Sequence, residues 1–255
     1  MPGEQVRTRD APAFMLRPGV VIPDWSCVDA EPARRALARI VQTSDRARSW
    51  SNLPAADDRV WQAVLAEFVA GRLELTAARI ARRASLAEDF ASAALARLAT
   101  RDLVVLSSDG RAVRAAYPFS ATDVGYRVRL GSRQVFALCA VDALGLGAMH
   151  GADSVISATC RHCAAPIEAM TGRKGATLDS FAPRQALVWC GLAEAGGCAA
   201  TSGCTVKTFF CRPAHLDAWR RTVGGKGEGI ALSMAEGHMV GCAIFAPMCR
   251  PASDA

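Results

Sequence analysis

Cysteine is distributed very unevenly along the chain, and this constrains its organisation more than any other feature. Of the ten cysteines in 255 residues, nine lie at or beyond Cys139. The first ten residues carry several charges and no apolar run, so we expect no secretory signal and a cytoplasmic location. In a reducing compartment, clustered thiols more often bind metals or act in catalysis than form disulfides. The second half is therefore expected to carry the chemistry, with disulfides as the alternative for an exported protein.

The overall composition is that of a globular protein. Hydrophobic residues make up 51% and charged residues 21%, which excludes a disordered or collagen-like chain. The longest apolar runs are far shorter than the roughly 20 residues that cross a bilayer, so no membrane partner is expected. The net charge of +6 is spread along the chain in short basic clusters. This spacing indicates a solvated surface rather than a polyanion-binding face.

The first half of the sequence is predicted to be mainly helical. Residues 1–57 contain many prolines and charges and are expected to form a partly ordered N-terminal extension, with one helix. Residues 58–118 show apolar side chains at helical spacing, then Thr76 as a helix cap. Ser85 and Glu88 have the spacing of a capping box that opens a third helix. Two short β runs joined by a turn follow, and this order predicts a winged-helix-like domain.

A winged helix normally suggests DNA binding, but the start of its third helix argues against it. This helix, which would enter the major groove, begins with Glu88 and Asp89. Both carboxylates would face phosphate, whereas base edges are usually read by Arg, Lys, Asn or Gln. We therefore expect no specific nucleic-acid partner.

Residues 119–250 change to short β runs around one helix. The helix is predicted over 139–149, and strands over 154–158, 186–190 and 205–210. The predicted fold class is α+β: a winged-helix-like helical domain followed by a small mixed or antiparallel β-sheet domain that carries the cysteine site.

Two local cysteine motifs stand out. Cys139 and Asp142 are three residues apart, which on a helix places a thiol and a carboxylate on one face. By itself this motif is weak, because a buried Cys beside a surface Asp gives the same spacing. Cys160 and Cys163 form a Cys-x-x-Cys that could chelate zinc or exchange disulfides. No second pair at that spacing follows, so a solvent-facing thiol pair is favoured over zinc.

The segment 136–144, Phe-Ala-Leu-Cys-Ala-Val-Asp-Ala-Leu, resembles the active-site segment of bacterial organomercurial lyases (alkylmercury lyases). The resemblance continues through Cys160, through Cys204 five residues before a Phe-Phe pair, and through 228–236. It covers roughly residues 60–241. Carried over onto matching positions, it implies that Cys139 and Cys204 are the mercury-binding thiols and Asp142 the proton carrier. Cys160 and Cys163 are then accessory thiols.

The implied activity is cleavage of a carbon–mercury bond by protonolysis, which gives Hg(II) and a hydrocarbon in mercury detoxification. Two soft thiolates weaken the bond and a carboxylate protonates the departing carbon. No organic cofactor is expected. The expected partners are an organomercurial substrate, low-molecular-weight cellular thiols that remove Hg(II), and mercuric reductase.

Two other functions remain open from sequence. One is a thiol-rich, metal-sensing winged-helix transcriptional regulator, which accounts for the cysteine count but not for Asp142. The other is a non-catalytic homologue that sequesters metal.

Overall fold

The structure is a computed structural model that describes residues 12–43, 46–191, 204, 206–222 and 228–249. It contains helices and antiparallel strands, which confirms the predicted α+β class. Within these residues, no helix has both the length and the apolar character needed to span a bilayer. The described sheet pairings are all antiparallel.

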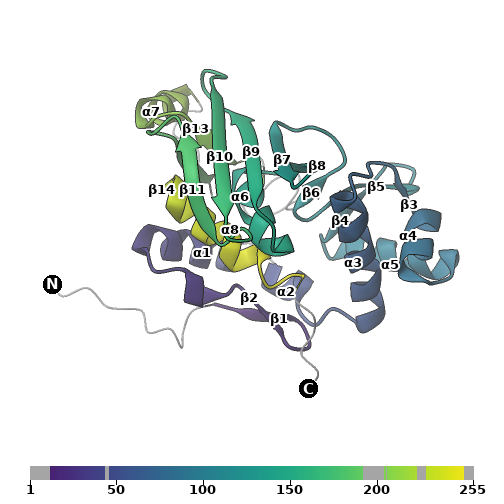
Figure 1. Cartoon of the computed structure of the whole chain (residues 1–255). Coiled ribbons are helices and arrows are strands. Elements are labelled where there is room, and N and C mark those ends of the chain that lie inside the picture. Colours follow the sequence, from purple (N-terminus) through teal and green to yellow (C-terminus); the bar gives the residue numbers. More distant parts are fainter. Residues whose placement is uncertain (1–11, 44–45, 192–203, 205, 223–227, 250–255) are drawn as a thin grey trace.

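The N-terminal segment folds back against the C-terminal helix. Its elements are β1 (Phe14–Arg17), β2 (Val20–Ile22), a 3-10 turn (Trp25–Cys27), α1 (Glu31–Thr43) and α2 (Arg46–Trp50). The backbone N–H of Asp24 donates to the carbonyl of Ala243 at 2.8 Å, and α1 packs on the last helix (Figure 1). This segment therefore covers one side of the C-terminal helix.

Three helices form the next part of the chain: α3 (Ala55–Val69), α4 (Ala77–Ala84) and α5 (Glu88–Thr100). Thr76 caps α4 as predicted, since its side chain accepts a hydrogen bond from the N–H of Arg79. The predicted capping box is wrong. Ser85 instead ends α4 in the left-handed conformation, with φ of 53°, and α5 starts at Glu88 without a side-chain cap. Because only three residues separate the two helices, Ser85 is used to close the first.

The largest sheet has nine strands in the order β11-β10-β9-β7-β8-β6-β5-β3, with β4 also paired to β5. Its strands are β3 (Leu75–Thr76), β4 (Val104–Leu106), β5 (Ala112–Ala116), β6 (Phe119–Ser120), β7 (Tyr126–Leu130), β8 (Arg133–Ala137), β9 (Ser154–Thr159), β10 (Pro166–Gly172) and β11 (Thr177–Ala182). The β5–β6 and β6–β8 pairings carry this sheet across the boundary predicted at residue 118.

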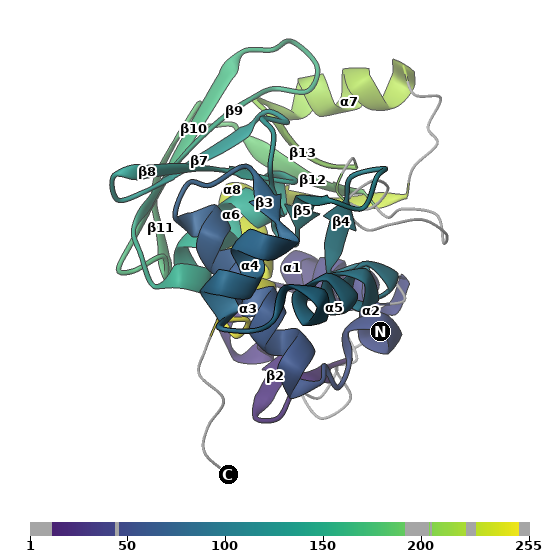
Figure 2. The same ribbon diagram turned by 90° about the vertical axis from the view of Figure 1, so that its right-hand side faces the viewer.

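A three-stranded sheet and three helices complete the chain. They are α6 (Ala140–His150), β12 (Leu187–Gly191), β13 (Lys207–Phe210), α7 (Pro213–Thr222), β14 (Gly229–Ser233) and α8 (Met234–Phe245). The predicted strand over 205–210 is found over 207–210, and residue 205 lies outside the described residues. Helix α7 packs beside β13 (Figure 2), and Figure 1 shows it on the opposite side of the molecule from α3, α4 and α5.

Helix α6 is the centre of the fold. It contacts strands of both sheets and packs tightly on α8. A Cβ added at Gly145 would lie 2.6 Å from the carbonyl oxygen of Gly241, so only glycine permits this approach of the two backbones. The close packing fixes the N-terminus of α6 inside the protein.

Candidate active site

The strand-to-helix junction between β8 and α6 positions the first two candidate residues. Cys139 is the N-cap of α6, in extended conformation, and its carbonyl accepts the N–H of Ala143 at 2.9 Å. Asp142 lies in the first turn of α6, and both residues are fully buried.

Cys204 reaches the same place from a distant part of the chain. It lies in the turn before β13 and is 2% exposed. Its thiol donates a hydrogen bond to Oδ2 of Asp142, with 3.5 Å between sulfur and oxygen. Candidate ligand atoms of Cys139, Asp142 and Cys204 all lie within 4.8 Å of one another. The structure thus brings together the three residues singled out from sequence.

The surroundings of Cys204 keep its proton on sulfur. Its pKa is raised well above the usual value, first by the hydrogen bond with Cys139, then by burial and by the negative charge of Asp142. Lys207 acts in the opposite direction. A neutral Cys204 beside an acceptor carboxylate is therefore a thiol with its proton already directed at Asp142.

Sequence reasoning missed two neighbours of this group. Tyr126 on β7 donates its hydroxyl to Oγ1 of Thr208 at 2.9 Å. Its pKa is raised to about 12, mainly by burial, with further contributions from the charges of Cys139 and Asp142. Lys207 is only 4% exposed.

Lys207 could have been noticed in the sequence, because it is a charged residue at the start of a mainly apolar strand. Nothing local marked Tyr126, because the contact joins residues 82 apart in sequence.

The chemistry of this donor set is specific. Two thiols and one carboxylate, all buried, suit a soft metal bound away from water. Three donors leave a coordination position for a group that the metal carries. The carboxylate adds a proton acceptor and donor within reach of that position.

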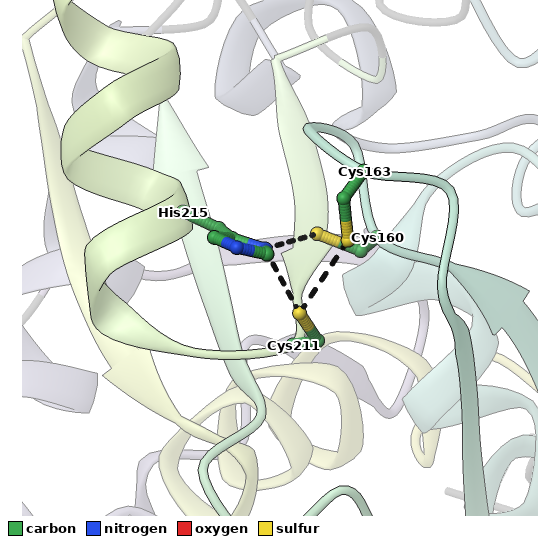
Figure 3. A group of neighbouring side chains, drawn as sticks. All are labelled: Cys160, Cys163, Cys211 and His215. Atoms are coloured by element: carbon green, nitrogen blue, oxygen red, sulfur yellow. Dashed lines mark hydrogen bonds between the residues drawn. The ribbon is translucent and has the colours of Figure 1, made fainter.

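Cys160 and Cys163 belong to a different group. They lie with Cys211 and His215, and the four candidate ligand atoms are all within 4.8 Å of one another (Figure 3). Cys160 is only 2% exposed and Cys163 is exposed, so the expectation of a solvent-facing thiol pair is wrong for Cys160.

The second half of the group does not repeat the Cys-x-x-Cys spacing of the first. It is Cys-x-x-x-His, from Cys211 to His215. Sequence alone carried that signal, but only the fold shows that the two halves meet.

The pKa of the Cys160 thiol is shifted in the opposite direction from that of Cys204. Burial acts to raise its pKa, but hydrogen-bond donors around its sulfur outweigh burial and lower the pKa to about 6. These donors are the backbone N–H groups of Cys211, Cys163 and His162, together with the side chain of His215. The four-residue group therefore favours the anion at Cys160, while burial and the neighbouring sulfurs raise the pKa of Cys211 to about 12. In the three-residue group, the raised pKa of Cys204 favours its protonated thiol.

A buried pair of thiols with a carboxylate, at a strand-to-helix junction of an α+β fold, is the donor set of a protein that binds a soft metal. Comparison with family models gives the particular family. The model described as MerB, alkylmercury lyase, matches residues 119–246, which is half of the chain. The chain belongs to the alkylmercury lyase family and is an organomercurial lyase.

Solved structures agree on the fold. The mercury-bound form of MerB2 superposes with a TM-score of 0.66 at 18% identity, covering 86% of this chain and all of that one. A search of curated proteins finds no match. The family comparison does not favour the metal-sensing regulator or the non-catalytic alternative.

Proposed function

We propose that Cys139, Cys204 and Asp142 carry out the cleavage of the carbon–mercury bond. The observation that supports these roles is the hydrogen bond from the Cys204 thiol to the Asp142 carboxylate, beside the buried Cys139. Within one buried group, soft ligands for mercury and a proton relay for carbon are present together.

The first step is binding. The thiolate of Cys139 displaces the exchangeable ligand of the organomercurial, forming a sulfur–mercury bond, and the thiol proton leaves to solvent. Mercury, still bonded to carbon, now lies next to Cys204 and Asp142.

The second step is protonolysis. Cys204 bonds mercury through sulfur and gives its proton to Asp142, and Asp142 passes this proton to the carbon. The electron pair of the carbon–mercury bond forms the new carbon–hydrogen bond, so the hydrocarbon leaves and Hg(II) remains on two sulfurs. No electrons are exchanged with an external donor, so no organic cofactor is called for.

The third step is release. Two external thiols replace the two cysteine sulfurs on Hg(II) and return their protons to Cys139 and Cys204. Cellular low-molecular-weight thiols supply this exchange, and a mercuric reductase is the acceptor that would consume the product. A cytoplasmic location fits this scheme, since free thiols are abundant there.

The helical part of the chain from α3 to β5 is proposed to be structural. Glu88 and Asp89 are exposed at the start of α5, where a DNA reader would need donors or cations. Arg97, the cation best placed on α5, forms a two-pronged ion pair with buried Asp57 of α3, at 2.6–3.2 Å. Gel-shift assays at low salt should show only weak, sequence-independent binding that disappears as salt rises. Tight binding to one operator would contradict the structural role.

The direct test of the proposed roles is incubation with phenylmercury and excess thiol, followed by measurement of benzene. Wild-type protein and Cys27→Ser, which removes an exposed cysteine far along the chain from the site, should both release benzene. Cys139→Ser and Cys204→Ser should not, because a hydroxyl is a poor ligand for mercury. Normal benzene release from either of these two variants would overturn the assignment.

A further inference from the structure

The group formed by Cys160, Cys163, Cys211 and His215 has no task in the proposed cleavage. It lies where three elements meet: the turn after β9, the end of β13 and the first turn of α7. Figure 3 shows the three sulfurs and the imidazole converging on one point. Since Cys, Cys, Cys and His are a common ligand set for structural zinc, the geometry of this group can be compared with that of a zinc site.

The distances fit a tetrahedral ion. With zinc–sulfur bonds of about 2.3 Å and zinc–nitrogen bonds of about 2.0 Å, tetrahedral ligands lie roughly 3.8 Å apart for two sulfurs and roughly 3.5 Å for sulfur and nitrogen. The Sγ atoms of Cys163 and Cys211 are 3.7 Å apart. Nδ1 of His215 lies 3.7 Å from Sγ of Cys160 and 3.1 Å from Sγ of Cys211. The two sulfurs of Cys163 and Cys211 are much too far apart for a disulfide, which needs about 2.05 Å.

Backbone N–H groups of the turn after β9 surround the sulfur of Cys160. After β9, the N–H of Cys160 donates to Ala165 and the N–H of Ala164 donates back to Cys160, which closes a tight turn with Ala164 at φ of 59°. The N–H groups of this turn and of Cys211 point at the sulfur of Cys160. Such outer hydrogen bonds orient and stabilise thiolate ligands in metal sites.

The group is also accessible to an ion. An open hollow of about 840 Å³ borders Cys163, Cys211 and His215. Cys163 is exposed, whereas Cys160 is buried. A metal can therefore enter from this hollow and then close the group against solvent.

We propose that Cys160, Cys163, Cys211 and His215 form a structural zinc site that fastens the β9–β10 turn to the end of β13 and the start of α7. All four protein ligands are present, so the ion keeps no open position for a substrate, in contrast to a catalytic site. Coordination through Nδ1 of His215 places the imidazole proton on Nε2.

The site has a consequence for the neighbouring strand. Cys211 directly follows β13, and Cys204 lies three residues before the same strand begins. The backbone N–H of Arg161 also donates to Phe209 of β13, at 3.0 Å. The zinc ion thus stabilises the C-terminal end of β13. The N-terminal end of the same strand follows the turn that carries Cys204. The proposal does not depend on the roles assigned to Cys139, Asp142 and Cys204.

The test is metal content of the untagged, full-length chain. After purification and dialysis, elemental analysis should find about one zinc per chain in the wild type. Cys139→Ser and the matched control Cys27→Ser should keep it. Cys163→Ser and the double variant Cys163→Ser/Cys211→Ser should lose most of it, with a lower thermal midpoint.

A second measurement needs no variant and so does not depend on folding of the mutants. Wild-type protein stripped with a chelator and reloaded with Co²⁺ should show the intense visible bands and sulfur-to-cobalt charge transfer of a tetrahedral thiolate site. Wild-type protein that takes up neither zinc nor cobalt would overturn the proposal. So would a cobalt spectrum that persists in the double variant, or a chain isolated with mercury and no zinc at this group.

Discussion

The two cysteine groups are made from similar atoms but are built for different tasks. Cys139, Asp142 and Cys204 are all buried and include a carboxylate, and one of their thiols is hydrogen-bonded to it. The Cys160 group has no carboxylate, has an imidazole as its fourth donor and is open to solvent at Cys163. One group offers an incomplete set of soft ligands with a proton relay, and the other a complete tetrahedral set. With the roles proposed above, a carboxylate and a vacant coordination position, rather than thiols alone, distinguish the catalytic group from the structural one.

The largest expected effect comes from removing the proton relay. Asp142→Asn should still bind mercury, because both thiols remain, but it should release hydrocarbon about 10²–10⁴-fold more slowly, which is the usual contribution of general acid–base catalysis. Single-turnover measurement of benzene from phenylmercury checks this. Zinc content should stay at the wild-type level, because Asp142 lies outside the zinc group. Hydrocarbon release close to the wild-type rate would mean that a thiol protonates carbon directly.

The next effect concerns the packing of α6 on α8, which positions Cys139 and Asp142 at the start of α6. A Cβ at Gly241 would lie 2.7 Å from the carbonyl oxygen of Val141 and 2.8 Å from the N–H nitrogen of Gly145. Gly241→Ala should lower the free energy of unfolding by about 1–3 kcal/mol through overpacking, and should reduce turnover more than zinc content. Urea denaturation measures the loss, with Ser92→Ala on the exposed face of α5 as a control. Unchanged stability would show that α6 and α8 can separate without cost.

A smaller effect is expected when a ligand of the second group is changed. Cys163→Ser should keep turnover of small organomercurials within about threefold of wild type, a loss of transition-state stabilisation below ~0.7 kcal/mol. The reason is that Cys163 belongs to the group with Cys160, Cys211 and His215, and not to the group of Cys139, Asp142 and Cys204. Steady-state assays with phenylmercury check this. A loss as deep as that of Cys139→Ser would show that the second group takes part in the reaction.

The smallest expected effect is that of pH on the single-turnover rate, which should stay constant between pH 7 and 9. Because the pKa of Cys204 lies well above the usual 9.0, its thiol form is complete below pH 9 and declines only as pH rises through the raised value. The single-turnover rate without added thiol should therefore be flat between pH 7 and 9. Circular dichroism at each pH confirms that the fold persists. A rate that rises with pH between 7 and 9 would mean that Cys204 reacts as a thiolate and does not supply the proton.

Local sequence determined the parts of this protein that depend on short-range geometry. Helical periodicity places Cys139 and Asp142 on one face, and this relation needs only the three-residue spacing. Thr76 as a cap and the strands around the cysteines follow from similar local rules. Ser85 shows where local rules fail. Its spacing to Glu88 fits a capping box, but the residue instead forms the C-terminal cap of α4.

Only the tertiary structure decided which distant residues meet. Cys204 joins Asp142 across 62 positions, and Cys211 joins Cys163 across 48. These contacts exist because α6 is fixed against α8 at Gly145 and Gly241, and because the turn after β9 bonds to β13 through the N–H of Arg161 and the carbonyl of Phe209. No spacing within either segment reveals these approaches. The sequence by itself specified the thiols, the carboxylate and their chemistry; the packing of helices and sheets divided them into one group with a proton relay and another with a closed ligand set.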